Sequence, residues 1–350
     1  MAHTIVLVGL GATGLAMARS LLRRTDVEII GAADRSPTAL GSDLGILSGL
    51  DPVGVTVGDD PAALPAADVA IVATTSDLDQ VAGTLIPLLE RSYNVMSICE
   101  ELSYPWSSHP DTARRLDDTA KAHDVTVVGT GANPGVLMDT LPLLLTTLTQ
   151  RVERVVIRRR TNMSRYGAIL SKFGMGLTAD EFAGAQNSGT VVGHYGFEQA
   201  IGALAAGLGW SLDTIDVGRV TPAIVSDTVR VGDHLTIEPG RIAAVTHAAR
   251  GMLDDRAVID LEIMFGFFDG SDRVTAGDDY RIEGTDQVLE LSSSIGFESF
   301  VSTIAAAVNV ATAVIDAPSG LLSMAELSTK SIASKGSRFS PPHVDDQSQS

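Results

Sequence analysis

Short, nearly continuous apolar runs recur through the first third of the chain. Such runs are typical of parallel strands that are buried on both faces. Segments with apolar residues at helical spacing lie between them, and this interleaving predicts a doubly wound α/β sheet with right-handed crossovers. The predicted strands are Thr4–Val8, Val27–Ala32, Val53–Val57, Val69–Ala73, Asn94–Ile98 and Val125–Val128, and the predicted helices are Gly14–Arg24, Leu78–Glu90 and Thr112–His123.

Beyond residue 150 the chain changes to alternation of apolar and polar residues. From Ile259 to Phe267 every second residue is apolar, and the charged residues Asp260 and Glu262 stand between them. This pattern is typical of an antiparallel strand with one buried face, and Arg151–Thr161 shows it too. The region therefore predicts a second, α+β domain with a mostly antiparallel sheet. Its other predicted elements are a strand at Arg241–Ala248, a hairpin turn at Leu253–Arg256, and helices at Thr178–Asn187 and His194–Leu208.

These patterns divide the chain into four expected parts. Residues 1–135 form the parallel-sheet domain and residues 136–297 the α+β domain. Phe297–Ile315 is rich in alanine and valine and has the length of a helix, so residues 298–327 are expected to return to the first domain. Residues 328–350 are rich in serine and contain Pro341-Pro342, which predicts a disordered tail.

Composition excludes several classes of protein. The 350 residues are 45% hydrophobic, which is too much for a disordered chain, and carry a net charge of −18. An acidic surface repels phosphate backbones and anionic lipid, so neither nucleic acid nor a membrane is an expected partner. No apolar run approaches the roughly 18–20 residues of a membrane helix, and the N-terminus lacks the basic region of a secretory signal. We expect a soluble, cytoplasmic protein.

Cysteine and histidine usage bears on metal sites. The one cysteine, Cys99, cannot form an intrachain disulfide or a cysteine-rich metal site. Five of the seven histidines share no metal-ligand spacing, and no metal is predicted. They are His109, His123, His234, His247 and His343.

The strongest motif, Gly9-Leu10-Gly11-Ala12-Thr13-Gly14, directly follows a predicted strand and opens a helix. Gly9 permits the tight turn, Gly11 lets the backbone approach a pyrophosphate, and Gly14 lets helix and strand pack closely. The free N–H groups at the start of the helix would then meet the pyrophosphate. The motif predicts a dinucleotide-binding Rossmann domain.

The residues after the second strand bear on which dinucleotide binds. Asp34 lies 20 residues beyond Gly14, where a carboxylate can accept hydrogen bonds from ribose hydroxyls and would favour NAD. Arg35 and Ser36 follow directly, and an arginine stacked on adenine with a serine beside it can hold the 2′-phosphate of NADP. The sequence leaves both cofactors, NAD or NADP, open.

Chemistry gathers beyond the carboxyl ends of parallel strands. Thr74 and Thr75 leave one strand and are expected to pass the nicotinamide ribose. After another strand, Asn133 is predicted to be the N-cap, and Pro134 the first residue, of a helix over Val136–Leu148. Small residues around them would let the backbone approach the nicotinamide.

Two adjacent carboxylates, Glu100 and Glu101, stand at the exit of another strand. Successive residues at a strand end point to opposite sides, so we expect only one to face the nicotinamide. A surface or helix-dipole role is the alternative. Cys99 beside them would suit a thiol nucleophile, but adjacent glutamates raise a thiol's pKa, and a buried strand cysteine is favoured.

Two features of the second domain are ambiguous. His194 is predicted to open a helix, either closing over the substrate as a proton donor or polar contact, or capping that helix. The run Arg158-Arg159-Arg160 could clamp a substrate carboxylate. Alternation splits it across two sheet faces, however, which favours a solvated face.

Four segments in this order carry a family resemblance. The chain resembles the 2,4-diaminopentanoate dehydrogenase and native amine dehydrogenase family, which is distantly related to dihydrodipicolinate reductase, from the N-terminus to about Leu327. The segments are GLGATG, the strand exit SICEELSYPW, the run GTGANPGVLMD, and GHYGFE.

The resemblance implies oxidation of a primary amine to a ketone or aldehyde plus ammonia with NAD(P), and the reverse reductive amination. It also implies a Rossmann domain, a covering α+β domain, and a homodimer formed through that second domain. A glutamate of the CEEL segment, Glu100 or Glu101, would be essential, since it can hold ammonium and stabilise an iminium cation. Asn162, Tyr166 and His194 are expected pocket walls.

Two departures limit the resemblance. Where we expect Gly-Asp-x-x-Thr before the last helix, the chain has Ser-Ile-Gly-Phe-Glu-Ser-Phe, which bears on the substrate more than on the cofactor. No His-His pair occurs, which disfavours dihydrodipicolinate reductase proper.

The leading hypothesis is therefore an NAD(P)-dependent amine dehydrogenase acting on a small primary amine or diamine. A reductase of an imine, ketone or semialdehyde that does not use ammonia would share the cofactor site. A non-catalytic NAD(P)-binding sensor would bind nucleotide and tolerate replacement of both glutamates.

Overall fold

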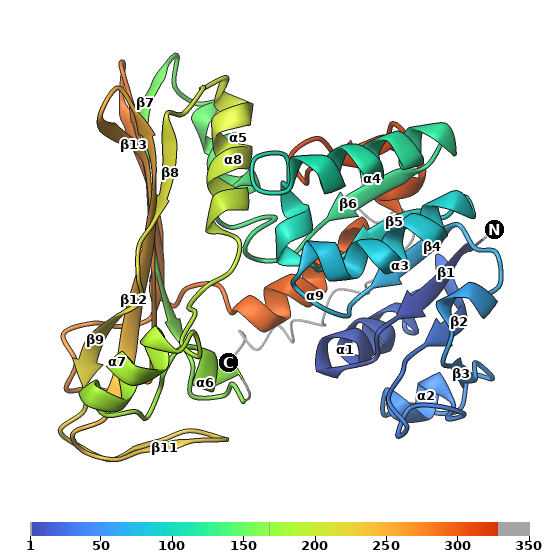
Figure 1. Ribbon diagram of the computed structural model, residues 1–350, viewed down its shortest axis with the longest axis horizontal. Coiled ribbons are helices and arrows are strands. Elements are labelled where there is room, and N and C mark those ends of the chain that lie inside the picture. The colour runs from blue at the N-terminus through green and yellow to red at the C-terminus, as the bar shows by residue number, and fades with distance from the viewer. Residues whose placement is uncertain (1, 168, 328–350) are drawn as a thin grey trace, which may run out of the picture.

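The apolar runs of the first third form one parallel sheet of seven strands. The computed structural model describes residues 2–167 and 169–327, and this sheet occupies one half of it (Figure 1). Its strand order is β16-β6-β5-β4-β1-β2-β3, with every pair parallel. The strands are β1 (His3–Val8), β2 (Val27–Ala33), β3 (Val57–Gly58), β4 (Val69–Val72), β5 (Asn94–Ser97), β6 (Thr126–Gly129) and β16 (Gly320–Leu322).

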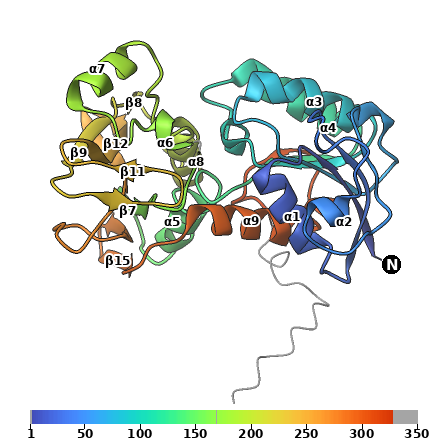
Figure 2. The same cartoon turned by 90° about the horizontal axis from the view of Figure 1, so that it is seen from below.

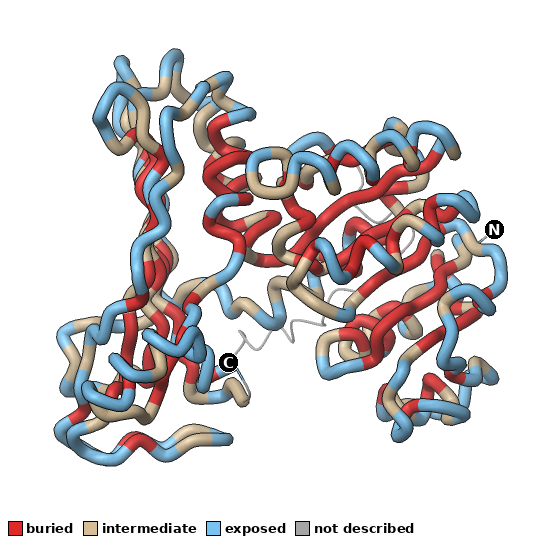
Figure 3. The backbone as a smooth tube through the Cα atoms, in the orientation of Figure 1, coloured by how far each residue is buried: buried red, intermediate tan, exposed pale blue. Residues whose placement is uncertain are grey.

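Helices cover both faces of this sheet, which confirms the doubly wound Rossmann fold. Alternate residues of one strand feed two cores: Ile5 packs with Met17 of α1 and Val308 of α9, whereas Val6 packs with Leu85 of α3 and Leu116 of α4. Figure 3 shows these strands buried along their length. The helical elements are α1 (Ala12–Leu21), α2 (Leu44–Leu47), α3 (Leu78–Glu90), α4 (Pro110–Ala122), α9 (Ser299–Val310) and the 3-10 turns η1 (Pro61–Ala63), η2 (Glu100–Ser103) and η3 (Ala313–Ile315).

The second sheet is mostly antiparallel, as predicted. Its order is β15-β14-β7-β13-β12-β8, β9 also pairs with β12, and only β7 and β13 run parallel among these pairs. The predicted hairpin turn joins β12 to β13 through Asp254 and Asp255, whose φ angles are 51° and 59°. The strands are β7 (Val152–Asn162), β8 (Thr214–Val217), β9 (Thr221–Val225), β12 (Ile242–Leu253), β13 (Arg256–Gly266), β14 (Gly277–Gly284) and β15 (Val288–Ser293), beside a separate ribbon of β10 (Arg230–Val231) and β11 (Thr236–Ile237).

Helices α5 (Thr140–Thr146) and α8 (Phe197–Leu208) lie on the face of this sheet that is turned toward the first sheet (Figure 1). With α6 (Ile169–Lys172) and α7 (Ala179–Asn187) they bury one set of alternating strand residues, such as Val155 and Ile157 of β7. The opposite set carries charged side chains. The strand alternation thus separates an apolar inner face from a polar outer face.

Residues 294–327 cross back between the two sheets. After β15 the chain enters α9, which packs against α1, and then adds β16 to the edge of the first sheet (Figures 1 and 2). In the described parts of the chain, no helix combines the length and apolar character needed to cross a membrane. The disordered tail predicted for residues 328–350 lies outside the described residues.

Three predicted elements differ from the structure in ways that bear on the site or the sheet. The helix predicted over Val136–Leu148 starts only at Thr140, because Gly135 has a φ of 124° and the Asp139 carboxylate caps the helix there. Asn133 and Pro134 are therefore neither its N-cap nor its first residue. The helix predicted from His194 starts at Phe197. Of the run Val53–Val57, only the last residue is in a strand.

Candidate active site

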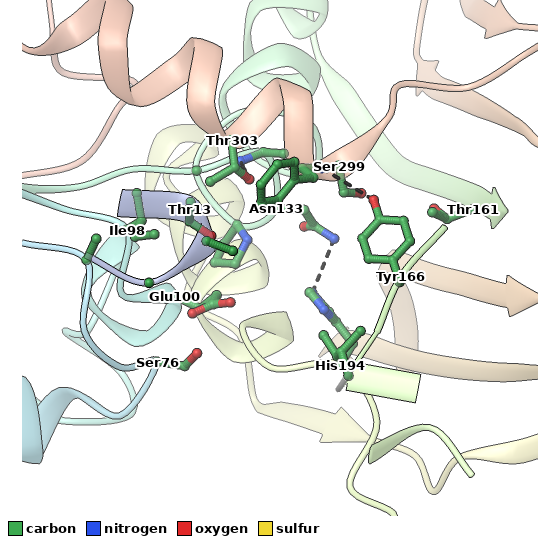
Figure 4. Close-up of a pocket in the computed structure, with 18 of the residues that line it drawn as sticks. Thr13, Ser76, Ile98, Glu100, Asn133, Thr161, Tyr166, His194, Ser299 and Thr303 are labelled. Atoms are coloured by element: carbon green, nitrogen blue, oxygen red, sulfur yellow. Dashed lines mark hydrogen bonds between the residues drawn. The ribbon is translucent and has the colours of Figure 1, made fainter. Parts of the chain in front are cut away.

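A cavity of about 590 Å³ lies between the two domains, at the carboxyl ends of the first sheet's strands. Figure 4 shows side chains from both domains and from α9 meeting around it. Most of its lining comes from the glycine-rich turn, the loops after β4, β5 and β6, the end of β7 with its following loop, and the first turns of α9. Lining residues include Gly11–Gly14, Ala73–Ser76, Glu100, Thr130–Pro134, Thr161, Met163, Tyr166, His194, Phe265, Ser299, Phe300 and Thr303.

The glycine-rich turn has the geometry of a phosphate cradle. A Cβ on Gly9 would lie 2.5 Å from the carbonyl oxygen of Ala73, and one on Gly14 would lie 2.0 Å from that of Gly9. A Cβ on Gly11 would meet nothing within 4 Å, so this backbone is open to the cavity. No side chain caps α1 at Gly11, which leaves the N-terminus of a ten-residue helix available to an anion. The turn therefore fits the pyrophosphate of a dinucleotide.

The acid after β2 supports this turn. One Asp34 oxygen accepts from the backbone N–H of Leu10, and the other from that of Ser36 at 2.7 Å. The Ser36 hydroxyl bonds to Thr38, and Arg35 is exposed. Asp34, Arg35 and Ser36 lie outside the cavity lining, whereas Thr74 and Thr75 are part of it.

Glu100 and Glu101 face different surroundings. The first lines the cavity beside Ser76 (Figure 4). The second accepts a hydrogen bond from the backbone N–H of Leu78 at 2.8 Å, and its carboxylate lies 3.6 Å from Nε2 of His109. Both begin the 3-10 turn η2, where the chain leaves β5. The geometry thus separates the pair and leaves Glu100 facing the cavity.

Burial raises the pKa of Glu100. The neighbouring charge of Glu101 raises it further, while a hydrogen bond from Ser76 and the positive charge of Lys172 act in the opposite direction. A carboxyl with a raised pKa holds and releases a proton closer to neutral pH than an ordinary glutamate does. Glu100 therefore has the position and the proton affinity of a general acid or base.

Cys99 is buried, as favoured from the sequence. Its thiol donates to the carbonyl oxygen of Ser76 at 3.1 Å, and burial raises its pKa to about 12. It lies outside the cavity lining and remains a thiol at neutral pH, so it has neither the access nor the ionisation of a nucleophile.

His194 faces the cavity from the second domain but does not cap α8. The cap is Gly196, with a φ of 97°, and His194 precedes it by two residues. Its Nε2 lies 3.2 Å from Nδ2 of Asn133, across the boundary between the domains (Figure 4). Burial lowers the pKa of His194 to about 3, with smaller contributions from His247 and Arg159.

The prediction that the arginine run lies on a solvated face is wrong for Arg159. Arg158 and Arg160 lie on the outer face in ion pairs, but Arg159 is buried and reaches the cavity wall. Its Nε lies 3.0 Å from Oδ1 of Asp278, and both side chains are 1% exposed. Strand alternation places Arg159 on the same face as Val155 and Ile157, which was the signal for its burial.

Asn162, at the end of β7, and Tyr166, in the loop after it, were both expected pocket walls, and one of them lines the cavity. Tyr166 does, and its hydroxyl donates to the Glu298 carboxylate. Asn162 is exposed, its amide oxygen accepts from the backbone N–H of Ser164, and it lies outside the lining. Its neighbours Thr161 and Met163 take that place, because successive strand residues point to opposite faces.

The sequence also missed the wall formed by α9. Ser299, Phe300 and Thr303 line the cavity, and the Thr303 hydroxyl accepts from the backbone N–H of Ala132 at 3.0 Å. Their contribution depends on where the returning helix docks, which local patterns do not encode. Within residues 2–167 and 169–327, no three His, Cys, Asp or Glu side chains are grouped to hold a metal ion.

Comparison with known proteins agrees with this arrangement. The family model of the 2,4-diaminopentanoate dehydrogenase C-terminal domain matches residues 136–339. A 2,4-diaminopentanoate dehydrogenase from Acetoanaerobium sticklandii is 31% identical over 329 residues, which cover 92% of this chain and 92% of that protein.

Solved structures extend the comparison to the whole fold. An amine dehydrogenase from Mycobacterium smegmatis superposes with a TM-score of 0.80 at 26% identity, covering 94% of this chain and 96% of that one. A scyllo-inositol dehydrogenase from Lactobacillus casei, with a TM-score of 0.50, 13% identity and coverage of 83% and 76%, is similar in fold alone. The family match and the curated relative together show that this chain belongs to the 2,4-diaminopentanoate dehydrogenase family.

Proposed function

We propose that the protein is an NAD(P)-dependent amine dehydrogenase. The balanced reaction is R₂CH–NH₃⁺ + NAD(P)⁺ + H₂O ⇌ R₂C=O + NH₄⁺ + NAD(P)H + H⁺, for a small primary amine or diamine. The observation that carries this proposal is the Glu100 carboxylate, which lines the same cavity as a glycine-rich turn and a helix N-terminus. Family membership and the amine dehydrogenase among its structural relatives support it.

The first domain supplies the residues that would hold NAD or NADP. Gly9, Gly11 and Gly14 shape the turn, and the N–H groups of Ala12 and Thr13 begin the helix that faces the pyrophosphate. When bound, the nicotinamide ring exchanges two electrons and one hydrogen with the amine-bearing carbon. Asp34, Arg35 and Ser36 would meet the adenosine ribose, and Thr74, Thr75, Asn133 and Pro134 the nicotinamide end.

Glu100 would manage the protons at the reacting nitrogen. Its carboxylate takes a proton from the ammonium group, so that the nitrogen lone pair can form the C=N bond of an iminium cation. After this proton has passed to solvent, as the H⁺ of the overall reaction, the ionised carboxylate stabilises the iminium cation and takes a proton from the water whose oxygen adds to the carbon. A carboxyl with a raised pKa returns its proton to the nitrogen as ammonia leaves. In reductive amination these steps run in reverse.

The second domain forms the wall that would face the substrate carbon. Met163, Phe173 and Phe265 are buried there, and the last two rings stack with centroids 4.2 Å apart. Arg159 is the one lysine or arginine among the described residues of the lining, and Asp278 balances its charge. The wall favours small, largely apolar groups on the amine-bearing carbon and excludes bulk water.

The test is NADH and NADPH oxidation with short ketones and aldehydes, with and without ammonium. We expect turnover that requires ammonium, and a loss of about 10²–10⁴-fold in kcat for Glu100→Gln. Glu101→Gln is the matched control and retains activity. Turnover that is indifferent to ammonium would instead indicate a carbonyl reductase. Nucleotide binding without turnover, unchanged in both variants, would indicate a sensor.

We also propose a homodimer formed through the outer face of the second sheet. That face is covered by charges of both signs: Asp260 lies 3.0 Å from Arg154 and 3.0 Å from Arg158, and Arg250 approaches it too. A twofold axis places this face of one subunit against the same face of its partner, where positive side chains can meet negative ones. Light scattering is expected to give the mass of a dimer. Val156→Asp, on this face, is expected to reduce the mass to that of a monomer, and Val53→Asp, on the first domain, is expected to leave it unchanged.

A further inference from the structure

A chain of hydrogen bonds links the second sheet to the cavity through two histidines. Nε2 of His247, on β12, lies 2.9 Å from the carbonyl oxygen of Gly218. Nδ1 of the same ring lies 3.0 Å from the backbone nitrogen of His194, which donates to it. The last contact of this series, at 3.2 Å, joins Nε2 of His194 to Nδ2 of Asn133.

The partners fix which nitrogens carry hydrogen. A carbonyl oxygen only accepts, so Nε2 of His247 is protonated, and a backbone N–H only donates, so its Nδ1 is bare. The Asn133 amide is placed with its NH₂ toward His194, and in this orientation Nε2 of His194 is the acceptor and its hydrogen is on Nδ1, while the buried Oδ1 of Asn133 has no partner among the described residues. Protonation of either ring would place two donors face to face. Both rings are therefore neutral in this arrangement.

Packing holds the His194 ring in place. Phe197 meets it edge-on with ring centroids 4.9 Å apart, and Phe265 lies behind it at 6.2 Å. The loop itself requires two glycines in the left-handed region. A Cβ on Gly193 would lie 2.6 Å from Nδ1 of His247, and one on Gly196 would lie 2.3 Å from Cδ of Pro134. The loop therefore packs directly against the segment that carries Asn133.

We propose that His194 is a positioning residue: a permanently neutral hydrogen-bond acceptor that orients the Asn133 amide across the two domains, rather than a proton donor in the reaction. This inference rests on the proposed function only for its kinetic consequences. Burial, His247 and Arg159 all disfavour the charged ring, in agreement with the geometry. Its effect is to hold the Asn133 loop, and with it one wall of the cavity, against the second domain.

The test compares three variants of the full-length protein. Glutamine can place its Oε1 near the position of Nε2, so His194→Gln keeps the acceptor, whereas His194→Asn is too short and His194→Phe has none. We expect His194→Phe and His194→Asn to raise KM for the carbonyl substrate about tenfold, with a smaller fall in kcat, and His194→Gln to restore most of the loss. The shape of the pH profile stays the same in all three.

A second readout separates positioning from general damage. In an Asn133→Ala background, His194→Phe is expected to add no further effect, because the contact is already lost. Loss of a limb of the pH profile in His194→Gln would overturn the proposal, and so would wild-type kinetics in His194→Phe or full additivity with Asn133→Ala.

A third readout does not depend on turnover. Nitrogen-15 NMR of the histidine rings is expected to show His194 neutral, with a bare Nε2, between pH 5 and 9. A ring that titrates in this range, or that carries its hydrogen on Nε2, would overturn the proposal. If the protein has no ammonium-dependent activity, the proposed function fails while this measurement still decides the role of His194.

Discussion

Glu100 and Glu101 are neighbours in the chain, but their carboxylates have different partners: that of Glu101 accepts from the backbone N–H of Leu78 at 2.8 Å, at the first residue of α3. Glu100 instead lines the cavity beside Ser76. The 3-10 turn that begins at this pair directs one carboxylate to a helix N-terminus and the other to the space between the domains. One carboxylate therefore supports the structure, while the other is free for chemistry.

This separation predicts opposite effects of two substitutions. Glu101→Ala leaves the N–H of Leu78 without its partner and is expected to lower the free energy of unfolding by about 1–3 kcal/mol, with activity largely retained. Glu100→Gln is expected to lower kcat about 10²–10⁴-fold without loss of stability, because burial already disfavours its charge. Denaturant unfolding and steady-state assays of both variants check this. An unstable Glu100→Gln, or an inactive Glu101→Ala that is folded at the assay temperature, would contradict it.

The charge of Lys172 is expected to shift the acid limb of the pH profile. Burial raises the pKa of Glu100, and the positive charge of Lys172 lowers it. Glu100 must be ionised to take a proton, so kcat/KM for the amine rises with pH through this pKa. Removing the cation in Lys172→Met raises the pKa, and the limb moves to higher pH. Lys121→Met, which removes a cation paired with Asp117 on α4, is the control.

Salt gives an independent check of this electrostatic effect. Lys172 is exposed, so its influence on Glu100 is expected to shrink as ionic strength rises. A shift of the limb to lower pH in Lys172→Met, or no difference from Lys121→Met at low salt, would be inconsistent with the assigned role of Glu100.

Local patterns were enough to predict the framework of the fold. Leu78–Glu90 was predicted to the residue, because Asp77 caps it and its apolar spacing is regular. The β7 and β13 alternation was equally clear, since each strand has one face toward the core. Position in the chain also predicted that the glycine-rich turn and Glu100 would line one cavity, because the carboxyl ends of parallel strands share one edge.

The parts that the sequence did not reveal depend on tertiary structure. The Asn133–Asp139 segment has helix-start residues, but Gly135 takes a left-handed conformation there that only packing specifies. Alternation placed Arg159 on the face of Val155 and Ile157, but its charge argued against burial, and the compensating Asp278 lies far along the chain on the neighbouring strand β14. The division of labour between Glu100 and Glu101 likewise depends on where α3 begins relative to β5.

The glycine-rich turn predicts a contrast between two alanine substitutions. At Gly11 a Cβ meets no protein atom within 4 Å, so Gly11→Ala is expected to fold normally but to bind NADH at least tenfold more weakly, since the methyl enters the phosphate space. At Gly14 a Cβ would lie 2.0 Å from the Gly9 carbonyl oxygen, so Gly14→Ala is expected to destabilise the domain itself. Calorimetric titration and thermal unfolding separate the two effects. Equal nucleotide affinity in Gly11→Ala and the wild type would show that the phosphates bind elsewhere.

The buried pair of Arg159 and Asp278 is expected to hold the returning chain. The pair binds both backbone groups of Phe297, the residue before the N-cap of α9: Asp278 accepts from its N–H at 2.7 Å, and Arg159 donates to its carbonyl oxygen at 3.0 Å. Removing one partner leaves a buried charge uncompensated, so Asp278→Asn is expected to cost about 3–5 kcal/mol of stability.

Two comparisons decide whether burial is the cause of that loss. The exposed pair of Arg241 and Glu181 is the matched control, and Glu181→Gln is expected to cost no more than about 1 kcal/mol. The double variant Arg159→Met, Asp278→Leu replaces both charges by apolar groups and is expected to recover much of the stability, because no unpaired charge remains. It should still lower the affinity for substrate, since Phe297 loses both of its partners and the α9 wall of the cavity is no longer fixed. Denaturant unfolding of the three variants measures the first effect, and KM measures the second. Equal losses in the buried and exposed pairs would show that burial does not govern the cost.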